Sequence, residues 1–236
     1  MINHNKHRFL LKLSDSLEKD RMFFMNVINS AQENINLFAK KQSWEIFTQE
    51  SFFDEVMIFD SKSLLNSTVV EITNSDPTMD LPEKFSGCLE NRILAVLSPE
   101  LYSKIYPEGN EENSFQKLLE HEIAHRLHVR ILIGDEDAMG PIWFYEGFAI
   151  YVSDQFKESL STLSKEEMWE IVNMSKRISY QKYGFFFKYL LQHVSLQEMV
   201  KKAGKVGFDQ WIYQIIFHSK KNISVNLPSL DKKRPK

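Results

Sequence analysis

The segment His121-Glu122-Ile123-Ala124-His125 carries residue types that bind a metal ion and activate water. Side chains four residues apart on a helix lie one above the other, so two imidazoles can reach one ion at about 2.0–2.1 Å. Glu122 is one residue further along and points to the side of the metal. There it can take a proton from metal-bound water. The simpler alternative is two histidines on a helix surface with a solvated glutamate beside them.

A third ligand is expected from a separate helix, because a catalytic zinc usually has three protein ligands and one open position. The segment Trp143-Phe-Tyr-Glu146-Gly-Phe-Ala-Ile-Tyr151 supplies a candidate. Glu146 is a single carboxylate among apolar and aromatic side chains. Burying it without a partner is costly, so a dication is its natural partner. The alternative is a glutamate in the first turn of a helix, where the helix dipole favours negative charge.

Together, these two segments resemble the gluzincin metallopeptidases, in particular the catalytic domain of the aminopeptidase N family. Members of that family carry an Asn-Glu-Gly-Phe-Ala stretch on the helix of the third ligand. The resemblance implies one zinc ion (Zn2+) with His121, His125 and Glu146 as its ligands, and Glu122 as the general base. It also implies a thermolysin-like catalytic domain.

The sequence departs from the family pattern at two places. The segment 126–145 is slightly longer than is usual in the aminopeptidase N family, so the loop around Gly134–Pro141 is expected to differ. Ile150 stands where thermolysin-like relatives carry an acid that orients a ligand histidine, and Asp154 or Glu120 is the candidate replacement. His128 lacks the surrounding pattern of the metzincins, so we interpret it as structural.

A later segment, Tyr180-Gln-Lys-Tyr183-Gly184, resembles the helix from which such peptidases project a tyrosine at the metal. A phenol at that place can donate a hydrogen bond to the oxyanion of the tetrahedral intermediate. We predict Tyr180 for this role, with Tyr183 as the alternative. A different interpretation makes both of them core tyrosines of an amphipathic helix.

Upstream, Gly87-Cys-Leu-Glu90-Asn91 resembles the Gly-x-Met-Glu-Asn exopeptidase motif of the same family, with Leu in place of Met. In that family the glutamate binds the free α-amine of the substrate, so the resemblance makes Glu90 a substrate-binding candidate. A carboxylate at one end of the cleft would hold the substrate amine so that the bond after the first residue is the one that is cleaved. The alternative is a turn that enters an edge strand, with Glu90 solvated.

The elements that must position these residues can be predicted from periodicity. Apolar residues recur at helical spacing over 15–50, which predicts a helix. Short runs rich in branched side chains predict strands at Val56–Phe59, Thr68–Ile72 and Ile93–Leu97. The chain reads as helical again from Asn113 or Ser114, where Asn113 and Gln116 resemble a weak capping box and Gly134 is a natural stop.

These elements predict an α+β fold with a mixed N-terminal lobe and a helical C-terminal lobe. We place the N-terminal lobe at 1–112, with a strand at the edge of the cleft near 93–97. The helical zinc-binding lobe spans 113–218, and a flexible basic tail spans 219–236. A nuclear localisation signal is the alternative interpretation of the tail.

The composition argues against several classes of protein and of binding partner. The chain has 236 residues, a net charge of −3 and a single cysteine, Cys88, so an internal disulfide is impossible. No broad basic surface for nucleic acid is indicated. The apolar stretch Phe9–Leu13 is too short for a signal-peptide core, and no run of about 18 apolar residues suggests a membrane span. We therefore expect a cytoplasmic protein that binds neither nucleic acid nor membrane; its oligomeric state stays open.

The expected function is hydrolysis of peptide bonds in a peptide or protein substrate that pairs as an extended strand with Ile93–Leu97. The alternatives are an aminopeptidase that uses Glu90 as its amine anchor, a processing protease with one narrow substrate, or a non-catalytic zinc-stabilised domain that binds proteins. The presence of Glu122, which is not a ligand, argues against the last, because structural zinc sites normally have four protein ligands.

Overall fold

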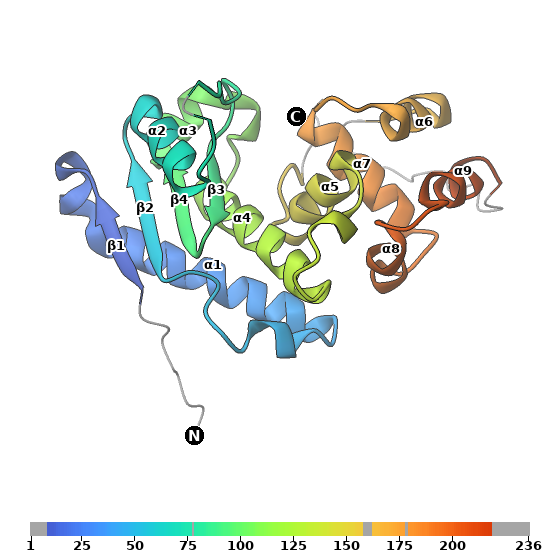
Figure 1. Cartoon of the computed structure of the whole chain (residues 1–236), viewed down its shortest axis with the longest axis horizontal. Coiled ribbons are helices and arrows are strands. Elements are labelled where there is room, and N and C mark those ends of the chain that lie inside the picture. The colour runs from blue at the N-terminus through green and yellow to red at the C-terminus, as the bar shows by residue number, and fades with distance from the viewer. Residues whose placement is uncertain (1–8, 77, 158–161, 178, 219–236) are drawn as a thin grey trace, which may run out of the picture.

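The computed structural model describes residues 9–76, 78–157, 162–177 and 179–218. It combines one small mixed sheet with helices, so the predicted α+β class is confirmed at that level. The strands gather at one side of the molecule, and helices α5 to α9, which lie between Ile142 and His218, gather at the other. The long helices α1 (Arg21–Lys41) and α4 (Ser114–Ile131) run between them (Figure 1). The segment 219–236, predicted as a basic tail, lies outside the described residues.

The sheet has the strand order β1-β2-β4-β3. Its strands are β1 (Leu10–Leu13), β2 (Glu55–Phe59), β3 (Gly87–Glu90) and β4 (Ile93–Leu97). The first three in spatial order run parallel, and β3 pairs antiparallel with β4. The prediction of strands at Val56–Phe59 and Ile93–Leu97 is confirmed. The prediction that Ile93–Leu97 lines the edge of the cleft is wrong, because this strand lies inside the sheet between β2 and β3. Its continuous apolar run suits burial on both faces.

The outermost strand on this side is β3, and its hairpin with β4 decides which backbone groups face outward. Asn91 and Arg92 form the two-residue turn, with φ values of 48° and 63°, as a type I′ turn requires. The Leu97 amide donates to the Ser86 carbonyl at 2.9 Å. Bonded pairs alternate along an antiparallel ladder, so residues 87 and 89 direct their N–H and C=O groups away from β4. Within the described residues, these groups form one open edge of the sheet, and β1 forms the other.

Two arginines hold the loop before β2 against the hairpin and against helix α4 (Ser114–Ile131). Arg92 contacts both carboxylate oxygens of Asp54 at 2.6 Å and donates to the Ser51 carbonyl at 2.9 Å. Arg130, on α4, donates to the same Ser51 carbonyl at 2.7 Å and also to the carbonyls of Phe47 and Glu50. Charge-assisted bonds of this kind are stronger than neutral ones. One carbonyl oxygen is therefore shared by both elements.

The N-terminal helices differ from the prediction in the length of one helix and in the type of one element. The helix predicted over 15–50 is α1 (Arg21–Lys41), flanked by 3₁₀ turns at Asp15–Asp20 and Glu45–Thr48. The strand predicted at Thr68–Ile72 is wrong, because these residues end helix α2 (Lys62–Ile72). Ser61 caps this helix by accepting a bond from the Leu64 amide, and Leu65 and Val69, four residues apart, are buried together. Cap and burial outweigh the strand preference of the branched residues.

The remaining helices follow β4 along the chain. They are α3 (Pro99–Ile105), α4 (Ser114–Ile131), α5 (Ile142–Val152), α6 (Lys165–Asn173), α7 (Tyr180–Leu191), α8 (Leu196–Lys202) and α9 (Phe208–His218). The predicted start of α4 is confirmed, but the capping box is not formed. Asn113 adopts a left-handed conformation with φ of 59°, and its side chain makes no capping bond.

The two predicted lobes share one core. A continuous cluster of buried apolar residues extends from β1 through α1 and α4 to α9. Helices α5 and α7 cross closely because each carries a glycine at the contact: a Cβ atom at Gly184 would lie 2.7 Å from Cγ2 of Ile150, and one at Gly147 would lie 2.9 Å from the Phe187 ring. Among the described residues, no helix is both long enough and apolar enough to cross a membrane.

Candidate metal centre

His121 and His125 project from α4 on one face of the helix, as their spacing predicts. The Nε2 atoms of the two imidazoles are 3.1 Å apart. His121 is 6% exposed, and His125 is partly buried. The pair therefore lies inside the molecule, whereas a histidine pair on the surface would be solvated.

Glu146 comes from α5, which packs against α4, and its side chain is only 2% exposed. Its Oε2 atom lies 3.2 Å from Nε2 of His121 and 3.6 Å from Nε2 of His125. The two histidines and Glu146 form a group that could hold a metal ion. Bonds of about 2.0–2.1 Å at tetrahedral angles place neighbouring ligand atoms roughly 3.3 Å apart. The three measured separations match this spacing, so these residues fit the expected zinc ion.

The electrostatics of the three ligands also favour a cation. Burial raises the pKa of the Glu146 carboxyl, but hydrogen bonds with the two imidazoles outweigh burial and hold that pKa well below its usual range. Burial lowers the pKa of His121, whereas the contact with Glu146 and the charge of Glu122 raise it, with a net rise. The two carboxylates thus need positive charge beside them, which protons or a dication can supply.

The outer nitrogen of His121 has a partner that the sequence analysis missed. Nδ1 of His121 lies 2.8 Å from Oε1 of Gln155, a carbonyl oxygen that can only accept a hydrogen bond. A proton on Nδ1 leaves the lone pair of Nε2 directed at the other ligands. The predicted candidates, Asp154 and Glu120, do not take this position. Glu120 instead accepts bonds from Asn34 at 2.7 Å and from Gln116 at 2.9 Å.

Glu122 stands beside the ligands without joining them. It is partly buried and lines the same cleft as His121, His125 and Glu146. A Cβ atom at Gly87 would come within 3.5 Å of its Cγ, so the start of β3 passes close to it. Burial raises the pKa of the Glu122 carboxyl, and the two imidazoles oppose the rise. A raised pKa suits a group that both accepts and returns a proton near neutral pH.

The two candidate tyrosines are placed differently. Tyr180, the first residue of α7, lines the cleft, and its ring centroid lies 5.9 Å from that of His121. Burial raises the pKa of Tyr180, so its hydroxyl remains a donor at neutral pH. Tyr183 is 2% exposed and is not among the residues that line the cleft. The geometry thus favours Tyr180 over Tyr183.

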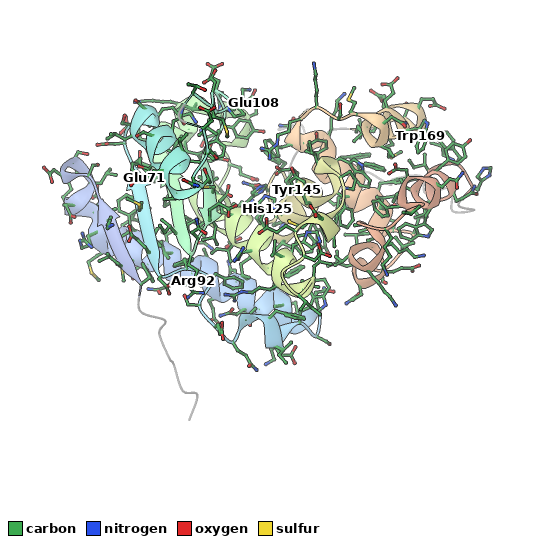
Figure 2. The ribbon with its side chains drawn as sticks, viewed as in Figure 1. Glu71, Arg92, Glu108, His125, Tyr145 and Trp169 are labelled. Atoms are coloured by element: carbon green, nitrogen blue, oxygen red, sulfur yellow. The ribbon has the colours of Figure 1, made fainter. Side chains whose placement is uncertain are left out.

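The site opens into a cleft of about 380 Å³ between the edge of the sheet and the C-terminal helices. Glu90 lines this cleft at the end of β3. Its side chain is exposed at the cleft wall. Desolvation by the surrounding protein and the nearby carboxylates of Glu136 and Glu122 raise the pKa of Glu90. His125 and Tyr145 lie close together at the middle of the molecule, where the two sides meet (Figure 2). Their ring centroids are 5.8 Å apart.

Arg177 is a second residue that the sequence analysis missed. Its Nη2 lies 3.0 Å from Oε1 of Glu146, and its Nη1 donates to the Tyr180 hydroxyl at 3.3 Å. It precedes α7 in an irregular segment, and its spacing three residues before Tyr180 is the only signal that points to it. His128, interpreted as structural, is fully buried and stacks on Phe148 at 4.4 Å; burial lowers its pKa to about 3.

Comparison of the chain with protein-family models, with curated proteins and with solved structures finds no match.

Proposed function

We propose that this protein is a zinc-dependent metallopeptidase of the gluzincin type. One observation carries the proposal: three ligand atoms at tetrahedral spacing line a cleft that also contains Glu122. A structural zinc site normally has a fourth protein ligand, whereas a catalytic site leaves that position open and keeps a base beside it. Within the described residues, the metal group has three members.

The open edge of β3 supports the binding of an extended peptide. Residues 87 and 89 direct backbone donors and acceptors outward, and both line the cleft. A substrate strand can pair with these groups, as peptides do when they extend an exposed sheet edge. Such pairing would carry the substrate past Glu122, which lies close to Gly87. We therefore assign substrate alignment to β3 in place of the segment Ile93–Leu97.

The chemistry divides between the metal and the side chains of the cleft. When bound, a zinc ion supplies Lewis acidity, which polarises a carbonyl group and makes a water molecule acidic near neutral pH. Glu122 accepts a proton from the attacking water on its carboxylate and then delivers it to the nitrogen of the broken peptide bond. The Tyr180 hydroxyl donates a hydrogen bond to the carbonyl oxygen as that atom becomes negative, an effect of roughly 3 kcal/mol on the barrier.

Replacement of the base separates catalysis from metal binding. We expect Glu122→Gln to lower the rate of cleavage of a denatured protein by about 10²–10⁴-fold, because the amide cannot accept the proton. The variant should still bind zinc, and its melting temperature should still rise when zinc is added, since its ligands are intact. Cleavage rate and zinc-dependent melting temperature are measured on the same preparations.

His125→Ala is the matched variant for the metal. It should lose both cleavage and the thermal shift, because a ligand is missing. Normal turnover by Glu122→Gln would contradict the proposed mechanism. A wild-type protein that binds zinc but cleaves no denatured protein would instead be a zinc-stabilised binding domain.

A further inference from the structure

The two oxygens of the Glu146 carboxylate have different partners. Oε2 faces Nε2 of His121 at 3.2 Å and Nε2 of His125 at 3.6 Å. Oε1 faces Nη2 of Arg177 at 3.0 Å. The carboxylate is thus held between the histidine pair and a guanidinium, with one oxygen for each. This division fixes the rotation of the carboxylate plane.

Arg177 reaches this carboxylate from outside the two helices that carry the ligands. Its side chain is 46% exposed, whereas that of Glu146 is 2% exposed. The guanidinium is a planar group with five donors, so it can bond several acceptors in one fixed geometry. A second donor, Nη1, reaches the Tyr180 hydroxyl at 3.3 Å. Arg177 therefore connects a ligand to the tyrosine proposed to stabilise the oxyanion.

The number of oxygens that Glu146 offers decides whether the site stays open. Carboxylates bind metal ions through one oxygen or two. A second oxygen would raise the coordination number above the four of a catalytic zinc and crowd the position that is kept for water and substrate. Partners that hold ligands in place tune metal sites strongly, and their loss commonly lowers metal affinity by about 10–100-fold.

We propose that Arg177 is a positioning residue that restricts Glu146 to ligation through Oε2 and sets the Tyr180 hydroxyl beside the open position. The inference rests on the zinc site of the proposed function. It adds a role for a residue that neither ligates nor exchanges a proton. The ion pair with Arg177 keeps Oε1 of Glu146 from binding the metal. The hydrogen bond from the same guanidinium holds the Tyr180 hydroxyl in place.

Cobalt(II) bound in place of zinc tests this role without any measurement of cleavage. Four-coordinate cobalt(II) absorbs visible light strongly, and five-coordinate cobalt(II) absorbs it less strongly. The wild-type protein should show the strong spectrum. Arg177→Met should show the weaker one, because Glu146 is free to add its second oxygen. Zinc affinity, measured by competition with a chromophoric chelator, should fall by about 10–100-fold in the same variant.

Two further variants separate positioning from general damage. Arg177→Lys keeps a cation that can contact Oε1, so it should restore much of the strong cobalt spectrum. Tyr180→Phe removes the bond between Arg177 and the Tyr180 hydroxyl and should keep the wild-type spectrum. Far-UV circular dichroism of each variant verifies that it is folded. If Arg177→Met does not fold, Arg177→Ala, which also removes the cation, carries the test with the same expected spectrum.

The outcomes distinguish the inference from the proposed function. A wild-type spectrum and affinity in Arg177→Met would overturn the role of Arg177 and leave the peptidase proposal intact, because Glu122→Gln tests that separately. The weaker spectrum in the wild-type protein would also overturn the inference, since the site would then be five-coordinate with Arg177 present. A protein that binds neither zinc nor cobalt would remove both.

Discussion

At the scale of single residues, the hydrogen bond between His121 and Gln155 makes a prediction about metal affinity. Gln155→Leu keeps the approximate size of the side chain but removes the acceptor 2.8 Å from Nδ1. Zinc affinity should fall by about 10–100-fold, because the imidazole loses the partner that fixes its tautomer and orientation. Competition with a chromophoric chelator measures the change.

Gln155→Glu is the matched control, because it retains an acceptor at the same position. Its zinc affinity should equal or exceed that of the wild type, since a carboxylate strengthens the basicity of the ligand. Nδ1 of His125 has no hydrogen-bond partner in the described part of the chain, so Gln155 has no counterpart on the second histidine. Equal affinity in the wild type and Gln155→Leu would show that packing alone orients His121.

The cluster of His121, His125 and Glu146 could be predicted from sequence, whereas the residues that support it could not, for a physical reason. His121 and His125 are related by helical geometry, which the sequence specifies directly. Gln155 lies beyond the end of α5, after Asp154 in a left-handed conformation with φ of 51°. Arg177 lies in an irregular segment. The direction of such side chains depends on tertiary packing, which local spacing does not encode.

At the scale of elements, the crossing of α5 and α7 predicts a steric limit at Gly184. Gly184→Val should lower the free energy of unfolding by about 1–3 kcal/mol, because the new side chain overlaps Cγ2 of Ile150 in a packed core. Urea unfolding measures the change. Lys182→Val places the same side chain at an exposed position of the same helix and should change stability far less.

A double variant identifies the contact. Ile150→Ala removes the methyl group that Gly184→Val would strike, so the two changes together should destabilise by less than the sum of their separate effects. Strict additivity would mean that the crossing adjusts elsewhere. This contact matters for the site because α5 carries Glu146 and α7 begins with Tyr180.

Some helices and strands could be predicted from the sequence, and others could not. The helix α4 and the strand β4 follow from clear periodicity, whereas the strand predicted at Thr68–Ile72 belongs to helix α2. Branched side chains favour strands only weakly, and the Ser61 cap with burial of Val69 decided the outcome. The order of strands in the sheet depends on pairings between distant segments. Nothing in the local pattern of Ile93–Leu97 distinguishes an edge strand from a central one.

At the scale of the whole molecule, the charges in the cleft lead us to predict which end of the substrate is recognised. Glu90 lies in it among other carboxylates that raise its pKa, so a cation from the substrate would relieve their repulsion. We expect peptides with a free N-terminus to be cleaved with a kcat/KM roughly 10- to 100-fold above that of their N-acetylated forms, as a charge-assisted hydrogen bond allows. The assay compares matched peptide pairs in the presence of zinc.

Glu90→Gln distinguishes an amine anchor from a general preference. This variant should lose the advantage of the free N-terminus and leave the cleavage of acetylated peptides unchanged. Equal cleavage of both forms by the wild-type protein would instead indicate an endopeptidase whose substrates lie along β3. In either case Glu122 and the three ligands keep their assigned roles.

The Ser51 carbonyl, which accepts from Arg92 of the hairpin and from Arg130 of α4, has a consequence for how this protein can vary. The two arginines use one oxygen atom as a common anchor for the strand edge and for the helix with the histidines. An insertion between residues 47 and 54 would move both elements together or detach one of them. Insertions and deletions are therefore expected in other surface loops of related sequences, whereas the segment 47–54 should keep a constant number of residues.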